Sequence, residues 1–435
     1  MPANDLIARI REVQHPLRGP DDLDPLLERV GDARVVLLGE ASHGTSEYYT
    51  WRHAVSERLV REKGFSFIAV EGDWPDCYRV NRYVKGWRDS GASAREVLRT
   101  FDRWPTWMWA NEEVVALAEW MREWNDGRPD EGRVGFYGLD VYSLWDSMAA
   151  VQEYLGRVDP DAARRARGAY ACFDPYGGDV QEYAMATALV PTSCEREAVS
   201  ILAEMRRRAP EYREDGRESY FNAEQNALVA RNAELYYRTM VRGGPTSWNV
   251  RDTHMIETLA RLMQHHGPEA KGIVWEHNTH IGDARATDMA RGGMVNVGQL
   301  ARQEWGDDEV VLVGFSSHRG SVIAGEEWGA PMERMPVPPA RDGSWEALLH
   351  EAGAQDRLIV TDDLAGVEGS MDPLGHRAIG VVYDPAAERW GNYVPTVLPL
   401  RYDALIYLDE TRALRPLHVE THETGEAPET FPSGQ

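Results

Sequence analysis

The feature that most limits what this chain can fold into is a series of short apolar runs that end abruptly at polar residues. Such runs occupy residues 34–39, 67–70, 134–138, 272–275 and 310–315, and three further runs occupy 358–361, 378–383 and 404–408. Runs of this length, rich in Val, Ile and Leu and separated by helix-periodic segments, are typical of buried parallel strands in βα units. We therefore predict an α/β fold with a mostly parallel sheet flanked by helices.

A long interval without a convincing strand separates the third run from the fourth. It far exceeds the dozen or so residues that a parallel crossover needs, and its best helical patterns cover residues 220–242 and 249–264. We predict a first part of the catalytic core over 1–150, a largely helical insertion over 151–268 and a second part of the core over 269–412. The polar, proline-containing segment 413–435 is predicted to be a disordered tail.

The charge, the apolar segments and the cysteine content of the chain limit the partners, the location and the disulfides that we expect. The 435 residues carry a formal net charge of −24, which repels phosphate backbones and anionic membrane surfaces, so we expect no nucleic-acid or membrane partner. The start lacks a secretory signal and no apolar run is long enough to span a bilayer, which predicts a cytoplasmic protein. Cys77, Cys172 and Cys194 are few, odd in number and widely spaced, which predicts free thiols.

The first polar cluster is GEASHGT, residues 39–45, which closes a predicted strand and leads into a helix. In open α/β sheets, ligands bind beyond the carboxyl ends of the strands, so Glu40 and His43 fall where a site is expected. Arg52 lies on the following helix beside its apolar stripe, and a buried arginine needs an anionic partner. The alternative is a structural Glu40–Arg52 ion pair with His43 as a helix cap.

Glu71 follows the second predicted strand directly. Neighbouring parallel strands lie about 5 Å apart, so Glu71 and His43 can meet if the first two strands are adjacent. A carboxylate beside an imidazole fixes its tautomer, as a general base acting on water requires. A helix-capping role is the alternative for Glu71.

The densest polar run at a strand end is WEHNTHIGDAR, residues 275–285. His277 and His280 are candidates to ligate a metal or to polarise a carbonyl, and Asp283 and Arg285 add charge of a kind found in buried sites. The sequence has no H-E-x-x-H helix, and the candidate ligands scatter over separate strand ends, which argues against a metal.

Other residues are weaker candidates for lining a pocket. Trp74, Asp140 and His318 follow or lie near strand ends, and the stretch RWPTWMW, residues 103–109, is aromatic enough to wall a cleft, although core packing is the simpler interpretation. His254, His265 and His266 are expected to be surface or capping residues. The G-x-S-x-G, G-x-G-x-x-G and G-x-x-x-x-G-K-[ST] motifs are absent, which disfavours a serine esterase and a nucleotide cofactor.

Six ordered strings of the sequence resemble the erythromycin esterase family. They are GEASHGTSEYYTWR (39–52), VEGDWPD (70–76), GLDVYSL (138–144), HNTHIGDARATDM (277–289), VGFSSHRGSV (313–322) and RAIGVVYDP (377–385). The resemblance implies an α/β core with a helical insertion and ring-opening hydrolysis of a macrolide lactone by water without a bound metal, a reaction that inactivates the antibiotic. It also implies functional roles for Glu40, His43, Arg52, Glu71, His277 and His280, with His43 as the base.

Residues and resemblance together lead to one hypothesis, a metal-independent hydrolase of a carboxylic ester or lactone that needs no cofactor. His43, made basic by Glu71 or Glu40, takes a proton from water, while Arg52, His277 and His280 orient groups and stabilise the oxyanion. The acidic balance and aromatic content favour a bulky, cationic small molecule as substrate. Two alternatives stay open: a metal-dependent hydrolase using His277, His280 and a carboxylate, and a protein that binds a small molecule without turnover.

Overall fold

The computed structural model describes residues 2–176, 180–189, 193–213, 216–241 and 243–418. In these residues, nine strands form one mixed sheet; eight follow one another across it, and the ninth pairs with one of them. The strands of this sheet are β1 (His15–Pro16), β2 (Val35–Leu38), β3 (Phe67–Asp73), β4 (Gly135–Asp140), β5 (Gly272–Trp275), β6 (Val310–Ala324), β7 (Glu333–Val337), β8 (Arg357–Val360) and β11 (Ala404–Thr411). A separate two-stranded sheet consists of β9 (Leu374–Arg377) and β10 (Tyr393–Thr396).

The order of strands across the sheet is β1-β8-β11-β6-β2-β5-β3-β4, and β7 pairs with β6. Neighbours from β11 to β4 are parallel, whereas β8, β1 and β7 pair in the antiparallel sense. The predicted α/β class with a mostly parallel sheet is confirmed. The strands of the first two predicted runs, β2 and β3, are not adjacent, because β5 lies between them.

One predicted strand, 378–383, is wrong. The backbone N–H of Ile379 donates to the carbonyl of Ala41, and Gly325 exchanges backbone hydrogen bonds with Val381 and Tyr383. The segment therefore forms only isolated bridges, to Ser42 and Gly325, and does not pair with a neighbouring strand. Its apolar side chains fill the core although the backbone is not part of a sheet.

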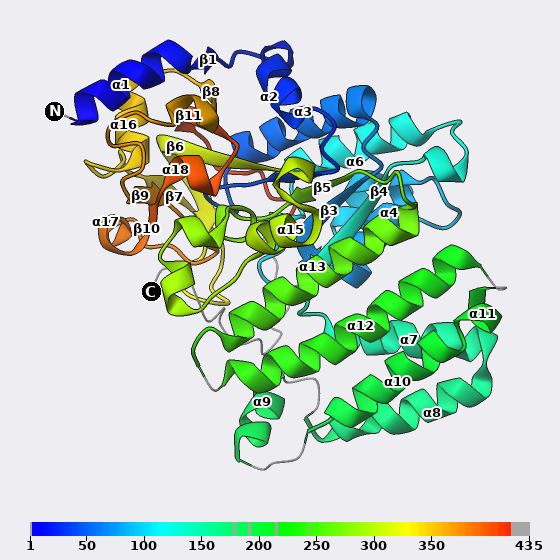
Figure 1. Ribbon diagram of the computed structural model, residues 1–435. Coiled ribbons are helices and arrows are strands. Elements are labelled where there is room, and N and C mark those ends of the chain that lie inside the picture. The colour runs from blue at the N-terminus through cyan, green and yellow to red at the C-terminus, as the bar shows by residue number, and fades with distance from the viewer. Residues whose placement is uncertain (1, 177–179, 190–192, 214–215, 242, 419–435) are drawn as a thin grey trace.

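Helices cover both faces of the sheet (Figure 1). They are α1 (Pro2–Val13), α2 (Asp24–Val30), α3 (Ser46–Lys63), α4 (Trp74–Val84), α5 (Ala94–Leu98), α6 (Glu112–Asn125), α7 (Leu144–Val158), α8 (Pro160–Tyr170), α9 (Val180–Leu189), α10 (Glu195–Arg207), α11 (Ala209–Tyr212), α12 (Arg217–Met240), α13 (Thr246–His266), α14 (Asn278–Ile281), α15 (Val297–Trp305), α16 (Trp345–Ala352), α17 (Glu388–Gly391) and α18 (Leu398–Arg401).

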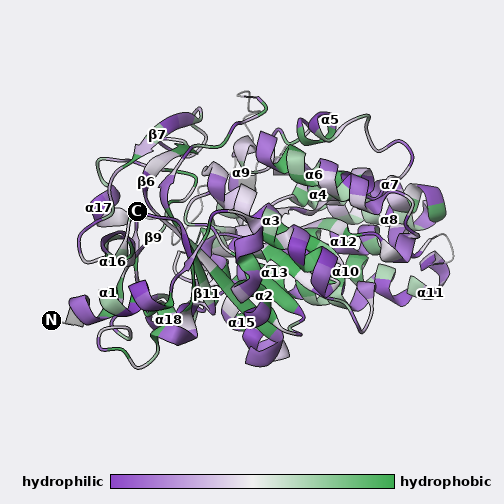
Figure 2. Ribbon diagram, turned by 90° about the horizontal axis from the view of Figure 1, so that it is seen from above, coloured by the Kyte–Doolittle hydropathy of each residue, from purple (hydrophilic) through white to green (hydrophobic). Residues whose placement is uncertain are grey.

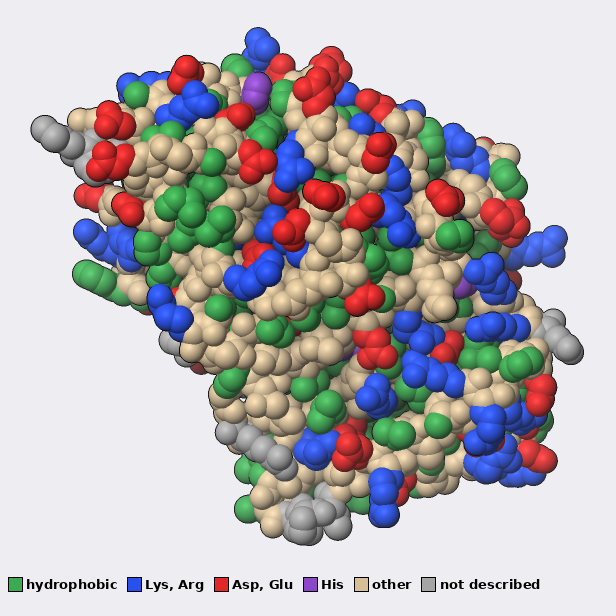
Figure 3. Space-filling view, viewed as in Figure 1, with side chains coloured by type: hydrophobic (Ala, Val, Ile, Leu, Met, Phe, Trp, Pro, Cys, Tyr) green, Lys and Arg blue, Asp and Glu red, His purple; other side chains and the backbone are tan. Residues whose placement is uncertain are grey.

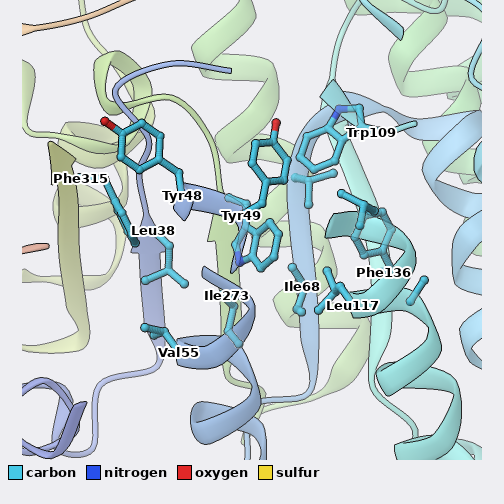
Figure 4. Packing of buried hydrophobic residues seen from close by; sticks show 14 of the residues in the cluster. Leu38, Tyr48, Tyr49, Val55, Ile68, Trp109, Leu117, Phe136, Ile273 and Phe315 are labelled. Carbon is cyan, nitrogen blue, oxygen red and sulfur yellow. The ribbon is translucent and has the colours of Figure 1, made fainter. Parts of the chain in front are cut away.

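Alternation along the buried strands divides the core between the two faces. Val36 and Leu38 pack on the face covered by α3 and α6, whereas Val35 and Leu37 pack on the face covered by α13 and α15, because successive side chains of a strand point to opposite faces. Figure 4 shows the first face, where Leu38, Ile68 and Ile273 meet aromatic rings. In Figure 2 the interior is correspondingly apolar and the outer helix faces are hydrophilic.

The interval between β4 and β5 is filled by helices α7 to α13, with α12 packed against α7, α10 and α13 (Figure 1). The two helical patterns predicted there correspond to α12 and α13. Cys172 and Cys194 form a disulfide in this layer, so the prediction of free thiols is wrong for that pair and holds only for the buried Cys77. Helix packing brings these two residues together, which their spacing in sequence does not show.

The segment after Arg412 differs in part from the predicted disordered tail. Leu414 and Leu417 are buried, and their backbone N–H groups donate to the carbonyls of Gly44 and Ala110. Residues 419–435 lie outside the described part of the chain. Within the described residues, no helix combines the length and apolar character that crossing a membrane requires.

Candidate active site

His43 lies on the connection between β2 and α3, where it forms a buried chain of contacts. Its Nδ1 is 2.9 Å from Oε1 of Glu40, and the other carboxylate oxygen of Glu40 accepts a hydrogen bond from Nη2 of Arg52 at 2.7 Å. The guanidinium of Arg52 lies between the rings of Tyr49 and Trp275, at 4.3 and 4.7 Å from their centroids. The Glu40–Arg52 ion pair therefore fixes the carboxylate that holds His43.

Two glycines allow this loop to pack closely. A Cβ at Gly39 would lie 2.1 Å from Oδ1 of Asn278, and one at Gly44 would lie 1.9 Å from the carbonyl oxygen of Ile323. The two glycines thus admit other parts of the chain, since Asn278 reaches across Gly39 to the backbone of Phe315.

Glu71, in β3, joins the neighbouring strands. Its Oε2 accepts from the backbone N–H of His277 at 2.8 Å, and its Oε1 is 2.8 Å from Nη2 of Arg251. Arg251, from α13, also donates to both oxygens of Asp140 at 3.0 and 2.7 Å. The carboxyl ends of β5, β3 and β4 are thereby tied to one buried guanidinium.

His277 follows β5 and lies between the two groups of residues. Its ring centroid is 5.0 Å from that of His43. Its Nδ1 accepts from the backbone N–H of Thr279 and lies 2.8 Å from the Thr279 hydroxyl, which assigns the proton to Nε2. That Nε2 is buried, and a hydrogen bond to the backbone of Ala41 partly opposes the lowering of the pKa of His277.

His280 plays a different part because both of its nitrogens have protein partners. Nδ1 lies 3.0 and 3.1 Å from the carboxylate oxygens of Asp252, while Nε2 lies 3.2 Å from Nη1 of Arg251 and 3.4 Å from Glu71. Its ring stacks on Trp248 at 4.4 Å. His280 therefore contacts Arg251 and Glu71 on one side and Asp252 on the other, and so helps to hold them in position.

Burial and neighbouring charges set the protonation states. Burial raises the pKa of Glu71, but the charges of His280, His43 and Arg251 outweigh it and lower that pKa well below its usual range. Burial lowers the pKa of His277 far below its ordinary value, and His43 lowers it further, so His277 is neutral. Burial also lowers the pKa of His280, but Asp252 and Glu71 reverse the effect and raise it.

Of these groups, His43, Glu71, Asp140 and Arg251 border a cavity of about 750 Å³, counted together with its open mouth, whereas Glu40, His277 and His280 lie behind its wall. It is lined by His43, Glu71, Gly72, Asp73, Asp76, Phe101, Arg103, Trp104, Pro105, Met108, Trp109, Asp140, Tyr142, Tyr237, Arg251, Trp328 and Val381. Most of the aromatic stretch 103–109 lines the cavity, so it does more than pack the core.

Several residues predicted to bind substrate lie elsewhere. Trp74 is buried, donates to Asn222 and stacks on Tyr137, and it does not line the cavity. Asp283 caps a turn and pairs with the half-exposed Arg285, while His318 stacks on His350 at 3.7 Å. Asp283 therefore serves a turn, and His318 lies within β6. Asp140 lines the cavity.

Sequence reasoning missed Arg251, Asp252 and Glu276, and misassigned His254, which is buried and not on the surface. Arg251 and Asp252 are adjacent charges on a helix and give no sign of burial in the sequence. Glu276, by contrast, directly follows β5 and is fully buried, with neither carboxyl oxygen hydrogen-bonded among the described residues. Burial raises its pKa well above normal, and Glu71 and Asp252 add to the effect.

The arrangement of possible metal ligands argues against the alternative of a metal-dependent hydrolase. Within the described ranges, no three His, Cys, Asp or Glu side chains converge as metal ligands would. A ligating imidazole needs an unengaged nitrogen lone pair, and both nitrogens of His280 are occupied by Asp252, Arg251 and Glu71.

Fold and site define an α/β protein with buried histidine–carboxylate pairs at the carboxyl edge of its sheet. The sequence pattern described as Erythromycin esterase matches residues 60–411, and the chain belongs to that family, which makes it a hydrolase of the family's type. It is 23% identical over 383 residues to the Erythromycin esterase type II of Escherichia coli, covering 82% of this chain and 88% of that protein.

Two solved structures share the fold. A protein from Bacillus cereus superposes with a TM-score of 0.77 at 20% identity, over 96% of this chain and 99% of that one. A mutant of the erythromycin esterase EreC in its open conformation superposes with a TM-score of 0.66 at 17% identity, over 91% and 95% of the two chains.

Proposed function

We propose that the protein hydrolyses a carboxylic ester or lactone with His43 as the general base. The observation that carries the proposal is the Glu40–His43 pair at the wall of the cavity. A carboxylate on Nδ1 holds the imidazole in the tautomer whose Nε2 accepts a proton. Glu40 is itself held by Arg52, so Arg52 acts through Glu40 and has no direct contact with substrate in this proposal.

The reaction then proceeds in two steps. Nε2 of His43 takes a proton from water, and the hydroxide attacks the carbonyl carbon to give a tetrahedral oxyanion. The C–O bond to the leaving alcohol breaks, and the alkoxide recovers the proton from His43, which leaves the acid and the alcohol as products.

Donors for the oxyanion are at hand on the neighbouring strand and helix. The neutral His277 carries its proton on Nε2 and lies beside His43, close to the backbone of Ala41. Arg251 lines the cavity and is held in place by Glu71 and Asp140. Fixed donors of this kind stabilise a developing negative charge. We assign the oxyanion role to this pair in place of Arg52 and His280.

The cavity favours a bulky small molecule with apolar surface, because most of its wall is aromatic or aliphatic. The name of the Escherichia coli relative makes macrolide lactones the first substrates to test. Inactivation of a macrolide antibiotic is accordingly part of the proposal.

Hydrolysis in ¹⁸O-labelled water tests the mechanism. A panel of macrolides and simple esters is incubated with wild type, His43→Ala and the control His350→Ala, which changes a half-exposed histidine outside the cavity. We expect one label in the product acid and a rate lower by roughly 10² to 10⁴ only in His43→Ala. Full turnover in that variant would remove His43 from the mechanism, and no turnover on any ester by wild type would favour the binding-protein alternative.

A further inference from the structure

The wall of the active-site cavity carries more negative than positive side chains. Four carboxyl groups line it, Glu71, Asp73, Asp76 and Asp140, against two guanidinium groups, Arg103 and Arg251. Arg251 is engaged by Glu71 and Asp140, and Arg103 pairs with Asp73. Asp76 pairs with Arg79, a half-exposed side chain that is not part of the wall. An acidic excess therefore remains where Asp73 and Asp76 meet the cavity.

Asp73 also has an oxygen without a partner. Its side chain is only 9% exposed, and Oδ1 makes no hydrogen bond to any described residue although it is buried. A buried carboxylate oxygen left without a donor costs free energy. A positive charge in the neighbouring cavity would offset part of this cost, because Asp73 also lines that cavity.

Aromatic rings line the same cavity as these carboxyl groups. The rings of Trp104 and Trp328 are 4.6 Å apart at the cavity wall. The ring of Tyr142 has the guanidinium carbons of Arg103 and Arg251 within 5.5 and 4.9 Å of its centroid. Aromatic faces combined with carboxylates are the usual surroundings of ammonium groups in proteins.

Burial affects the titration of both aspartates. It raises the pKa of Asp73 to about 6, with Arg103 opposing and Asp140 and Asp146 adding to the rise. It raises the pKa of Asp76 to about 7, with Asp73 and Asp146 adding and Arg79 and Arg103 opposing. Arg103 and Arg79 therefore compensate the buried charge of the two aspartates only in part.

We propose that Asp73 and Asp76, with the rings of Trp104 and Trp328, form a subsite for a protonated amine or quaternary ammonium group of the substrate. This inference rests on the proposed hydrolase, because the cation is the part of the ester held beside His43. It does not rest on the net charge of the chain, since Figure 3 shows Lys and Arg side chains interspersed with acidic ones and gathered over α10 and α12.

The subsite makes cation binding depend on pH in one direction. Below about pH 6 both aspartates are mainly protonated and neutral, and above about pH 7 both are ionised. Affinity for a permanent cation therefore rises as the pH rises across this interval. A neutral ligand of the same shape does not share the dependence.

Binding is measured with benzyltrimethylammonium, a permanent cation that cannot be hydrolysed, by quenching of tryptophan fluorescence at pH 5.5 and pH 8. Its neutral carbon isostere, neopentylbenzene, is the comparison ligand. We expect the cation to bind roughly tenfold more tightly at pH 8 than at pH 5.5, about 1.4 kcal/mol, and the isostere to bind equally at both. Equal affinity of the cation at the two pH values would overturn the proposal.

Variants assign the effect to residues. Asp76→Asn and Asp73→Asn are expected to weaken cation binding at pH 8 about tenfold and to leave neopentylbenzene unaffected. Asp161→Asn on α8, which changes an exposed carboxylate, serves as the control. Unchanged cation affinity in both aspartate variants contradicts the assignment, and the wild-type pH series gives an answer even if one variant does not fold.

Turnover separates this inference from the proposed function. For a hydrophobic choline ester and its neutral 3,3-dimethylbutyl isostere, Asp76→Asn should raise KM for the choline ester about tenfold more than KM for the isostere. A fall in kcat for both esters with unaltered binding would make the aspartates proton donors and overturn the subsite. If neither ester is hydrolysed but cation binding behaves as expected, the hydrolase proposal fails and the binding subsite stands.

Discussion

Nη2 of Arg251 lies 2.8 Å from the carboxylate of Glu71, a residue 180 positions earlier in the chain. The contact joins α13 to the end of β3, and both side chains are almost completely buried. The helical layer therefore contributes directly to the polar edge of the sheet. A change in that layer acts on the site through Arg251.

Breaking this pair should destabilise the protein strongly. Arg251→Met leaves Glu71 and Asp140 as buried charges without their shared partner, and removing one member of a buried ion pair costs about 3–5 kcal/mol. Urea unfolding followed by circular dichroism measures the free energy of unfolding. Asp161→Asn, which removes an exposed pair with Arg164, should change it by less than about 1 kcal/mol. Equal effects of the two variants would show that the buried pair carries no special weight.

Glu40→Gln should slow the reaction, and because it leaves the buried Arg52 without its carboxylate partner it should also lower the free energy of unfolding. The amide can no longer hold His43 as a carboxylate does, and a general base in the wrong tautomer loses most of its effect, roughly 10² to 10⁴ in kcat. Steady-state kinetics should show the loss in kcat, with KM little changed. Glu47→Gln, seven positions further on and outside the cavity wall, is the matched control, and a similar kcat in both variants would argue against a role for Glu40.

His254 should make stability depend on pH below neutrality. Burial lowers its pKa from 6.5 to about 4, so between these values the unfolded chain binds a proton that the folded protein does not. Its contribution is complete above about pH 6.5 and decreases as the pH falls, by about 2 kcal/mol between pH 7 and pH 5. Urea unfolding at the two pH values should show a smaller difference in His254→Gln than in wild type. The same difference in both proteins would assign the dependence to other groups.

Chelation should leave turnover intact. The nitrogens of His280 are taken by protein partners, and the described residues offer no set of three converging ligands. We expect purified protein to contain far less than one equivalent of zinc, manganese, iron or nickel by elemental analysis, and its activity to survive dialysis against EDTA. A stoichiometric metal whose removal abolishes turnover and whose return restores it would support the metallohydrolase alternative.

The features best predicted from the sequence were the strands and the polar residues that directly follow them. Runs such as 272–275 became strands because a buried parallel strand must be apolar on both faces. Polar residues after those strands, including Glu40, His43, Glu71 and His277, gather at one edge because parallel strands end on the same side of a sheet. These relationships are local, so one sequence was enough to predict them.

Other features depend on tertiary packing and could not be predicted in this way. Strand order is one, since nothing in the apolar runs shows that β5 enters between β2 and β3. Burial of polar helix residues is another, because Arg251 and His254 differ from surface residues only in what packs against them. Trp74 illustrates the opposite error, since a large aromatic residue after a strand was assigned to the site and belongs to the core.

The place of β5 between β2 and β3 also affects how the protein is made. During translation, β2, β3 and β4 emerge from the ribosome long before residue 272. For that period β2 lacks both of its sheet neighbours, β5 and β6, and β3 lacks β5. Bare strand edges attract other chains and promote aggregation. Newly synthesised molecules are consequently most vulnerable while the helices α7 to α13 are being translated, and a chaperone that shields strand edges would be of greatest benefit during that interval.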